Sequence, residues 1–375
     1  MRSTGIRRFP LLLGAVGLAM GFLSCEPIYD AAPDCRLGIN LRFVYDYHME
    51  PGANAFPANV DCVNVLVFDP EGKYLTQFVE TSDALQDEDY RMGIPLDPGE
   101  YRLVVYGGTA CEDASFDLTP DWNSAEGRSA VREDIRATLP LKDGICSDTQ
   151  LHDIVERTGG LFFGTLDVSL TEDDIASTFR EETVYLMKDT NDIQIILQEL
   201  SSPYSVDYKD YEFRIIDDNF ILDGRNKAVE IATEDFQPFY APFNSENRVM
   251  GYVEPAAREG VLLTEDEARP VQVACAEFST SRLLVEHMSS ARLVVTTAVQ
   301  EESGEEPRTV IDIPLLVYLS AIRGFGDRWI KDDQEFLDRQ SRWTLMFFLQ
   351  RNVWVKARVA VNWWTVRIND IDLGY

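Results

Sequence analysis

The sequence predicts an all-β protein built from two tandem β-sandwich domains. Apolar residues such as Ile39, Leu41 and Phe43 alternate with polar ones, which is the pattern of a half-buried strand. Turn sequences such as residues 69–72 (Asp-Pro-Glu-Gly) separate short apolar runs, and this spacing is typical of sandwiches and barrels. The chain of 375 residues has room for two or three domains of ~150 residues each.

The first 25 residues predict export and lipid attachment. Arginines precede an apolar run, residues 11–23, which ends at Ser24-Cys25. A basic start, an apolar run of ~7–15 residues and a small residue describe an export signal, and the run is shorter than the ~17–25 residues that span a bilayer. The cysteine after the small residue resembles a bacterial lipobox. We therefore predict a lipoprotein signal peptide at residues 1–24 and lipidation at Cys25, with ordinary signal cleavage as the alternative.

Residues 25–34 are rich in proline and acidic residues and lack periodicity, so they predict a tether between the lipid and the fold. The first domain is expected at residues 35–188. Its predicted strands are 39–47, 63–68, 74–79, 101–106 and 161–168. The segment 112–160 is polar and irregular, and a short helix is expected near 149–157.

The second domain is expected at residues 189–375, after a break in the pattern around 184–192. Its predicted strands are 211–216, 270–276, 281–286, 291–297, 309–319, 343–349 and 352–361. In the last of these, Val353, Val355 and Ala357 begin an alternation that predicts one continuous apolar face as far as Val361. Residues 334–339 mix acidic and basic side chains at short spacing and predict a helical turn or loop.

The charge of the chain excludes several kinds of partner. With 34 basic and 64 acidic residues, the net charge is −30. Such a field repels phosphate backbones, so nucleic-acid binding is not expected. It also repels an anionic membrane surface, which leaves the lipid as the means of attachment. A content of 45% hydrophobic residues predicts a folded chain and not an acidic disordered tail.

The cysteines predict at most two disulfides. Besides Cys25, the chain has Cys35, Cys62, Cys111, Cys146 and Cys275, an odd number for an oxidising compartment. The spacing identifies no pairing, although a Cys111–Cys146 bridge would close a plausible surface loop. Cys62 and Cys275 lie in apolar runs, which favours burial as small apolar side chains. Because no C-x-x-C motif occurs, a zinc ribbon or a thioredoxin-type site has no support.

No catalytic or metal site is predicted. The three histidines, His48, His152 and His287, lie in different segments, and no G-x-S-x-G motif marks a nucleophile. His152, Asp153 and Glu156 would share one face of a helix, for which a solvated surface is the simpler interpretation. Residues 217–219 and 223–224 faintly resemble a calcium loop but lack the ligand spacing, which favours a turn. Carboxylate pairs carry little information in so acidic a chain, so we expect no cofactor, no metal and no small-molecule substrate.

Blocks along nearly the whole chain carry a family resemblance: Asp34-Cys35 and residues 41–47, 55–56, 65–69, 72–74, 90–92, 98–101, 161–164, 190–193, 279–283, 334–340 and 361–366. In these blocks the chain resembles the FimB-type fimbrial anchor lipoproteins of Gram-negative anaerobes. The resemblance implies two transthyretin-like sandwiches, lipidation in the outer membrane, and a position at the base of a fimbrium whose pilin subunits join by donor-strand exchange. It implies no catalytic residues.

The expected function is therefore structural: a subunit that anchors a fimbrium and ends its growth. The expected partners are the stalk pilin and, through the lipid, the outer membrane. We expect the coupling strand within residues 365–375, where Val366, Ile368 and Ile371 could enter a neighbouring sheet. The alternative is a free surface lipoprotein that acts as an adhesin and binds host glycan or protein. The third hypothesis is an acidic glycosidase.

Overall fold

The computed structural model describes residues 38–49, 52–141, 152–154, 157–172, 180–201, 204–229, 237–253, 269–298, 306–323 and 329–361. The predicted signal peptide, Cys25, the tether and Cys35 lie outside these residues. So do Cys146 and the expected coupling residues Val366, Ile368 and Ile371.

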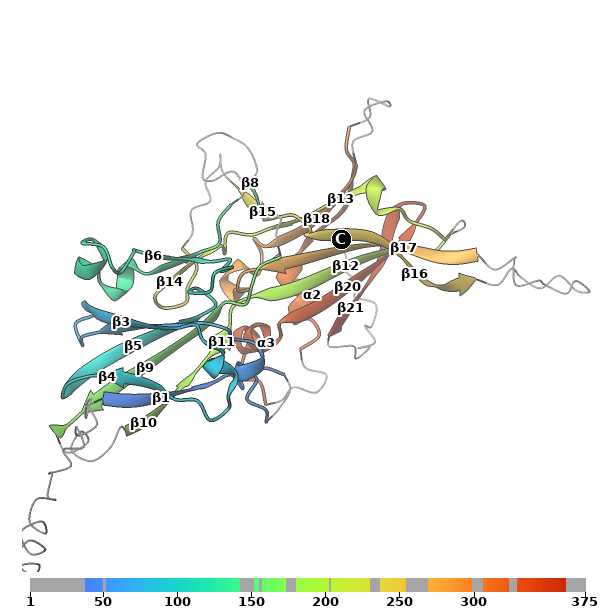
Figure 1. Cartoon of the computed structure of the whole chain (residues 1–375). Helices are drawn as coiled ribbons and strands as arrows, with labels where there is room; N and C mark the ends of the chain where they lie inside the picture. Colours follow the sequence, from blue (N-terminus) through green and yellow to red (C-terminus); the bar gives the residue numbers. More distant parts are fainter. Residues whose placement is uncertain are drawn as a thin grey trace, which may run out of the picture.

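The first half of the chain forms two packed sheets, and this confirms the predicted all-β class. One sheet, the β1 sheet, has the order β10-β1-β4; the other, the β2 sheet, has the order β11-β9-β5-β2-β3 (Figure 1). Ile39, Val65 and Leu103 belong to one buried cluster between the two sheets. The strands are β1 (Gly38–Val44), β2 (Val63–Phe68), β3 (Tyr74–Glu80), β4 (Met92–Pro95), β5 (Gly99–Gly107), β9 (Phe162–Leu170), β10 (Arg180–Tyr185) and β11 (Met187–Lys188).

Two further five-stranded sheets come mainly from the second half. The β12 sheet has the order β16-β17-β12-β20-β21, and the β13 sheet has the order β19-β18-β13-β15-β8. Ile195, Phe213 and Leu345 lie in the cluster between them. The strands are β8 (His152–Ile154), β12 (Asn191–Glu199), β13 (Tyr211–Ile216), β15 (Pro238–Tyr240), β16 (Asn244–Val253), β17 (Arg269–Thr280), β18 (Arg292–Thr297), β19 (Thr309–Pro314), β20 (Arg342–Gln350) and β21 (Val353–Val361).

A small third unit connects the two halves. Its order is β14-β7-β6, made of β6 (Asp117–Thr119), β7 (Arg136–Thr138) and β14 (Ile221–Asp223). Because β14 follows the expected boundary at 188/189 and β7 precedes it, this sheet crosses that boundary. One buried cluster contains both Tyr106 of β5 and Ile193 of β12. The division into two domains at 188/189 therefore stays a prediction.

The prediction of a helix near 149–157 is wrong for residues 152–154, the central part of that segment that the structure describes. Residues His152–Ile154 form β8, which runs parallel to β15 as an edge of the β13 sheet. The three-residue strand is too short to show a period of two, and its conformation is set by a partner more than 80 residues away. His152 and Asp153 are therefore neighbours on a strand and do not share a helical face.

Two more predicted strands are corrected. The expected strand 309–319 ends at Pro314, which has no N–H to continue a ladder, and α2 (Leu315–Ser320) follows with Leu315, Leu316 and Leu319 buried. The expected strand 281–286 is a loop that leads into the short 3-10 helix η7 (Val285–His287). The other 3-10 helices among the described residues are η1 (Phe56–Ala58), η2 (Asp83–Gln86), η3 (Gly127–Ser129), η4 (Arg132–Asp134) and η5 (Tyr208–Asp210).

Of the two alternatives expected at 334–339, a helical turn or a loop, the structure shows a helix, α3 (Asp333–Arg339). The side chain of Asp332 accepts a hydrogen bond from the backbone N–H of Glu335, which satisfies one of the free donors at the start of a helix. Phe336 and Leu337 are buried, so one face of α3 packs on the core.

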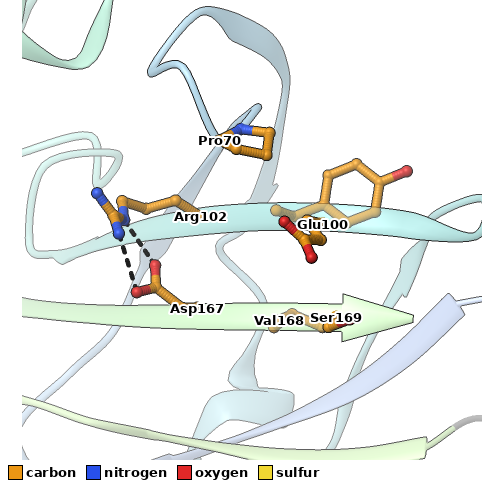
Figure 2. A pocket seen from close by; sticks show the side chains of 7 residues that line it. Pro70, Glu100, Arg102, Asp167, Val168 and Ser169 are labelled. Carbon is orange, nitrogen blue, oxygen red and sulfur yellow. Dashed lines mark hydrogen bonds and ion pairs between the residues drawn. The ribbon is translucent and has the colours of Figure 1, made fainter. Parts of the chain in front are cut away.

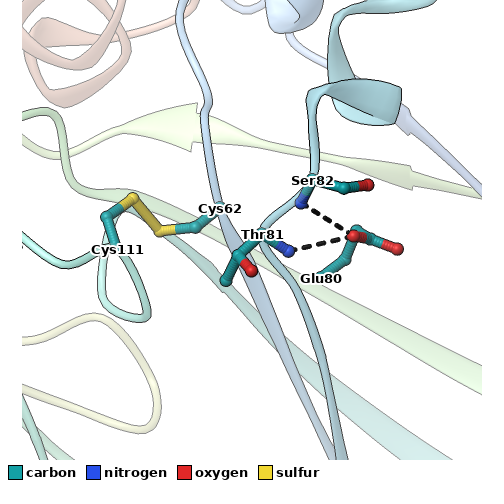
Figure 3. The surroundings of a disulfide bond; sticks show 5 residues. All are labelled: Cys62, Glu80, Thr81, Ser82 and Cys111. Carbon is teal, nitrogen blue, oxygen red and sulfur yellow. Dashed lines mark hydrogen bonds between the residues drawn. A yellow bond between two sulfur atoms is a disulfide. The ribbon is translucent and has the colours of Figure 1, made fainter.

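The disulfide in the structure joins Cys62 to Cys111, so the bridge that the sequence left open between Cys111 and Cys146 is wrong (Figure 3). Cys62 immediately precedes β2, and Cys111 follows the end of β5, the antiparallel neighbour of β2. Val63 is paired with Gly107, which brings the two cysteines to a Cα–Cα distance of 5.4 Å. The pairing of β2 with β5 thus determines that Cys62 is the partner of Cys111. The spacing of the cysteines in the sequence did not reveal this. Cys275 is a buried free thiol, as expected.

Removing this disulfide is expected to destabilise the fold measurably. The bridge spans 49 residues, and the loss of a cross-link of that length costs about 2–4 kcal/mol because the unfolded chain gains freedom. The double variant C62S/C111S should show this loss in urea denaturation under oxidising conditions. The matched variant Cys146→Ser should be as stable as the parent; an equal loss there would instead support the Cys111–Cys146 pairing.

Candidate functional site

The last described strand lies at an edge of the β12 sheet. β21 pairs with β20 on one side, and no described strand pairs with its other side. An edge strand presents unpaired backbone N–H and C=O groups, which can pair with a strand from another molecule. β21 is therefore the described part of the chain that leads into the expected coupling segment.

The prediction of one continuous apolar face on β21 is wrong. Leu349 pairs with Trp354 and Phe348 with Lys356, so that Val355 is the extra residue of a bulge. Before the bulge Trp354 turns toward the core, where its ring lies 5.8 Å from that of Phe347, and Val353 and Val355 are about half exposed. After the bulge Val359 is buried. A bulge exchanges the two faces of a strand, which alternation alone does not reveal.

The hairpin between β20 and β21 is held by Glu199 at the end of β12. Arg351 and Asn352 both have positive φ, as a two-residue hairpin turn requires. Their backbone N–H groups donate to the two carboxylate oxygens of Glu199, at 3.0 and 3.1 Å. Burial raises the pKa of Glu199, but hydrogen bonds from Ser201 and from this turn outweigh it and lower the pKa. The turn that precedes β21 is thus hydrogen-bonded to β12, the central strand of its sheet.

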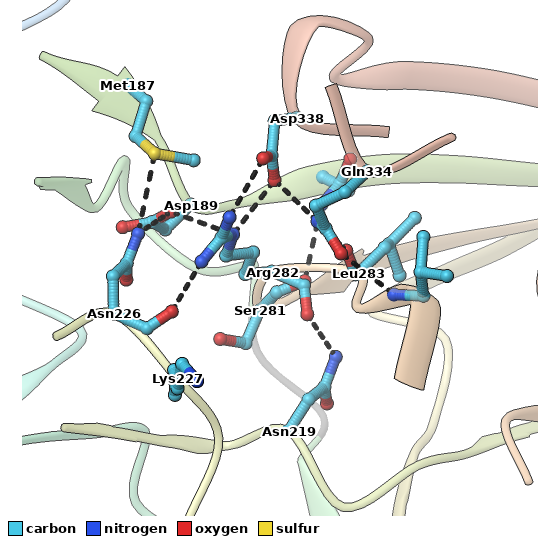
Figure 4. A network of polar contacts seen from close by, with 12 residues as sticks. Met187, Asp189, Asn219, Asn226, Lys227, Ser281, Arg282, Leu283, Gln334 and Asp338 are labelled. Atoms are coloured by element: carbon cyan, nitrogen blue, oxygen red, sulfur yellow. Dashed lines mark hydrogen bonds and ion pairs between the residues drawn. The ribbon is translucent and has the colours of Figure 1, made fainter. Parts of the chain in front are cut away.

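A buried polar cluster lies in the second half of the chain, where it meets the first half (Figure 4). We call it the polar junction; its members are Asp189, Asn226, Arg282, Gln334 and Asp338. Asp189 lies between β11 and β12 and donates its backbone N–H to Leu161 of the first half. Arg282, in the loop after β17, binds Asp338 of α3 through two hydrogen bonds of 2.8 Å each, and its Nε lies 3.8 Å from Asp189 Oδ1.

Asn226 and Gln334, the two uncharged members of the polar junction, each donate a hydrogen bond to one of these carboxylates. Asn226 donates to Asp189 at 2.9 Å, and Gln334 donates to Asp338 at 2.9 Å. Asp189 is completely buried, and burial raises its pKa to about 7, although Arg282 and Asn226 act in the opposite direction. The arrangement therefore stabilises one geometry of the connection, because each buried charge depends on partners from other segments.

A cation–π contact continues this connection at the surface. The guanidinium of Arg339, on α3, lies 4.0 Å from the ring centroid of Tyr47, which follows β1. The same guanidinium donates to Glu335 at 2.8 Å and lies 5.0 Å from the ring of Trp329. α3 thus contacts the first half through Tyr47.

Two of the three histidines have different partners in the structure. His287 pairs with Asp217 in a buried contact of 2.6 Å, and this hydrogen bond raises the pKa of His287. His48 contacts the backbone oxygen of Ala53. In the described part of the chain no group of three His, Cys, Asp or Glu side chains could hold a metal ion. The faint calcium loop at 217–219 instead supplies the partner of His287, a pairing across 70 residues that sequence spacing does not reveal.

An open pocket of about 260 Å³ lies on the first sandwich, between Pro70 of the β2–β3 turn and strands β5 and β9 (Figure 2). Arg102 and Asp167 line it and bind each other through hydrogen bonds of 2.6 and 2.9 Å. These two charges satisfy one another, so the pocket presents them as a pair and not as a separate acid and base.

Comparison with known proteins identifies the family. The model of the fimbrillin-A associated anchor proteins Mfa1 and Mfa2 matches residues 32–370. The chain belongs to this family of fimbrial anchor proteins. The resemblance inferred from the sequence blocks is thereby confirmed. No curated protein sequence matches the chain.

Solved structures agree with the anchor family. A protein from Bacteroides thetaiotaomicron, proposed to be an adhesin, is 35% identical; the match covers 91% of this chain and all of that one, with a TM-score of 0.70. A second protein of that species, proposed to bind polysaccharide, is 27% identical over 88% and 98% of the two chains (TM-score 0.66). The fimbrial anchor protein Mfa2 from Porphyromonas gingivalis shares the fold at 16% identity, over 88% and 98% (TM-score 0.57).

Membership in the anchor family assigns a role in fimbriae or adhesion at the cell surface. The family is non-enzymatic in kind, and it implies association with fimbrial subunits. No helix in the described ranges is both long and apolar enough to cross a membrane.

Proposed function

We propose that this protein is an outer-membrane lipoprotein that anchors a fimbrium and terminates its growth. The observation that carries the proposal is the family match across residues 32–370, which begins just after the leader ending at Ser24-Cys25. A polymer that grows by strand addition needs a last subunit that stops growth and holds the assembly on the cell. An acyl chain at Cys25 supplies the attachment at about 0.8 kcal/mol per buried CH₂.

Coupling to the first pilin is assigned to the C-terminal segment. Residues 365–375 follow the edge strand β21, and Val366, Ile368 and Ile371 are the apolar side chains expected to fill pockets in the pilin sheet. The polar junction supports this role, since it stabilises the start of the second half, where Asp189 donates its backbone N–H to Leu161 of the first half. Tension between membrane and fimbrium would therefore pass through fixed polar contacts.

A surface adhesin is the second candidate function. It is favoured by the relative that is proposed to bind polysaccharide and by the pocket between Pro70 and the β5–β9 pair. Retention of fimbriae distinguishes the two functions, because an adhesin can be lost without any change in fimbrial length.

Deleting the gene is expected to produce long fimbriae that are shed into the medium, because no subunit caps and holds the growing end. Electron microscopy of the cells and pilin immunoblots of the medium would measure length and shedding. Complementation with the intact gene should restore both. Fimbriae of normal length that stay on the deletion strain would contradict the anchor function and favour the adhesin.

Replacing Cys25 with Ala, in a leader that still permits export, is expected to move the protein from the membrane fraction to the soluble fraction. The acyl chains provide the hydrophobic contact that a chain of net charge −30 lacks. Labelling with a clickable fatty acid should mark the parent and not C25A, and Cys35→Ala serves as the control that keeps its label. Equal labelling of parent and C25A would show that this cysteine is not the anchor.

A further inference from the structure

The outer face of the β12 sheet carries a buried apolar cluster. Ile196, Val273 and Cys275 point away from the core that the β12 and β13 sheets share, since their chain neighbours Ile195 and Ala274 belong to that core. Their exposed fractions are 6%, 0% and 1%. A sheet that packs on one face only has a solvated, polar outer face, so this degree of burial indicates a second covering layer.

The strand register places this cluster in the middle of the sheet. Met346 of β20 pairs with Ile196, which pairs with Cys275 of β17. Arg358 of β21 and Glu246 of β16 continue the row at its two ends. The row is therefore apolar across its three central strands and charged at both edges.

Described residues cover only the flanks of this row. Arg248, opposite Val273 on β16, reaches to the carboxylates of Glu246 and Glu277 and covers one side. The buried cluster itself contains only residues of β12 and β17, with Val271 and Met346 packed against it, and no other described element joins it. At the opposite edge the Nε of Arg358 is shielded from solvent, although no described residue accepts its hydrogen bond.

We propose that the C-terminal segment of this chain, residues 362–375, docks across the outer face of the β12 sheet and covers Ile196, Val273 and Cys275. This inference rests on the proposed function in one respect: the segment that covers the sheet is the one assigned to coupling, so the free anchor would hold its coupling strand on its own surface. Release of the segment would then accompany binding of the first pilin.

The length of the segment is sufficient. It begins directly after β21, and 14 extended residues reach about 46 Å at about 3.3 Å per residue. From β21 to β17 there are three strand spacings, which is about 14 Å, and a covering layer lies about 10 Å above a sheet. The segment therefore reaches the cluster with several residues to spare.

Composition favours this segment over the loop between β16 and β17. The segment has six large apolar residues: Trp363, Trp364, Val366, Ile368, Ile371 and Leu373. The loop, residues 254–268, has five acidic residues, and Glu246 and Glu277 on the same side of the sheet would repel them. The segment has two acidic residues against the five of the loop, so the same repulsion is weaker for it.

Cys275 provides a direct probe of the cover. In the full chain with Cys25, Cys35 and Cys146 replaced by Ser, it is the one free thiol, because Cys62 and Cys111 form the disulfide. Burial raises the pKa of Cys275 to about 11, so a covered thiol reacts slowly with a maleimide at pH 7.5. We expect Ile368→Asp, or a stop codon after Val361, to increase the labelling rate at least ten-fold. The neighbouring variant Asn369→Asp introduces the same charge and should leave the rate near that of the parent.

Hydrogen exchange of the β17 backbone separates uncovering from unfolding, because uncovering leaves the β17 amides protected. An unchanged labelling rate in the truncated chain would overturn the proposal, as would an increase found only when residues 254–268 are deleted. Loss of β17 amide protection would also overturn it, since the segment would then hold the sheet together and not cover it. These measurements use unlipidated protein without fimbriae. A negative labelling result would therefore not contradict the proposed anchor function. Conversely, a loss of the anchor proposal in experiments on cells would not change the labelling result.

Discussion

Replacing Arg282 with Leu should lower the free energy of unfolding by about 3–5 kcal/mol, because it leaves buried carboxylates without their positive partner. Asp338 would lose both of its 2.8 Å hydrogen bonds from the guanidinium, and the fully buried Asp189 would lose its nearest cation. Arg282 also donates to the backbone oxygen of Asn226, which would be left without that donor. Urea denaturation followed by tryptophan fluorescence measures the change.

Arg292→Leu is the matched control, since it is the same substitution at a surface ion pair. Arg292 binds Asp312 across β18 and β19, and both side chains are about two-fifths exposed. Such pairs contribute about 0–1 kcal/mol. The triple variant R282L/D189N/D338N removes the charges together and should recover part of the lost stability. Equal losses for Arg282→Leu and Arg292→Leu would show that the polar junction stabilises the fold no more than a surface ion pair does.

Ending the chain after Gln350 should unfold the second sandwich, whereas ending it after Trp364 should leave the protein folded but unable to retain fimbriae. Loss of β21 removes the buried Val359 and the Trp354 ring that packs on Phe347, and it exposes the edge of β20. It also removes both turn N–H groups that bind Glu199, which would become a buried carboxylate with fewer partners.

Near-ultraviolet circular dichroism and limited proteolysis of the two truncated proteins would measure folding, and electron microscopy would count fimbriae on cells that carry them. The full-length chain is the positive control for both measurements. A chain that ends after Trp364 and still retains fimbriae would remove Val366, Ile368 and Ile371 from the coupling. A compact chain ending after Gln350 would show that β21 is not needed for the fold.

The parts of the fold that sequence patterns predicted well have local causes. β2 and β13 match their expected bounds, 63–68 and 211–216, because a mostly apolar run in β2 and an alternation of apolar and charged residues in β13 are each delimited by polar or turn-forming residues. The helical segment at 334–339 was also predictable, since the capping side chain and the residue it binds are three positions apart. In these elements the stabilising contacts that decide the conformation lie within a few residues.

The parts that the sequence did not predict depend on distant partners. β8 is a strand because it pairs with β15, Cys62 bonds Cys111 because β2 and β5 are neighbours, and the bulge at Val355 places Trp354 in the core. The polar junction collects residues as far apart as Asp189 and Asp338, and no spacing in the sequence marks them as partners.

By itself, then, the sequence determined the all-β class and the family, because each is recorded in short stretches of chain. Only the tertiary structure decided which cysteines pair, which way the last strand faces, and which charges are buried together. The physical reason is that register, disulfide geometry and burial arise from contacts between segments far apart in the sequence, and the free energy of such contacts exists only once the sheets have packed.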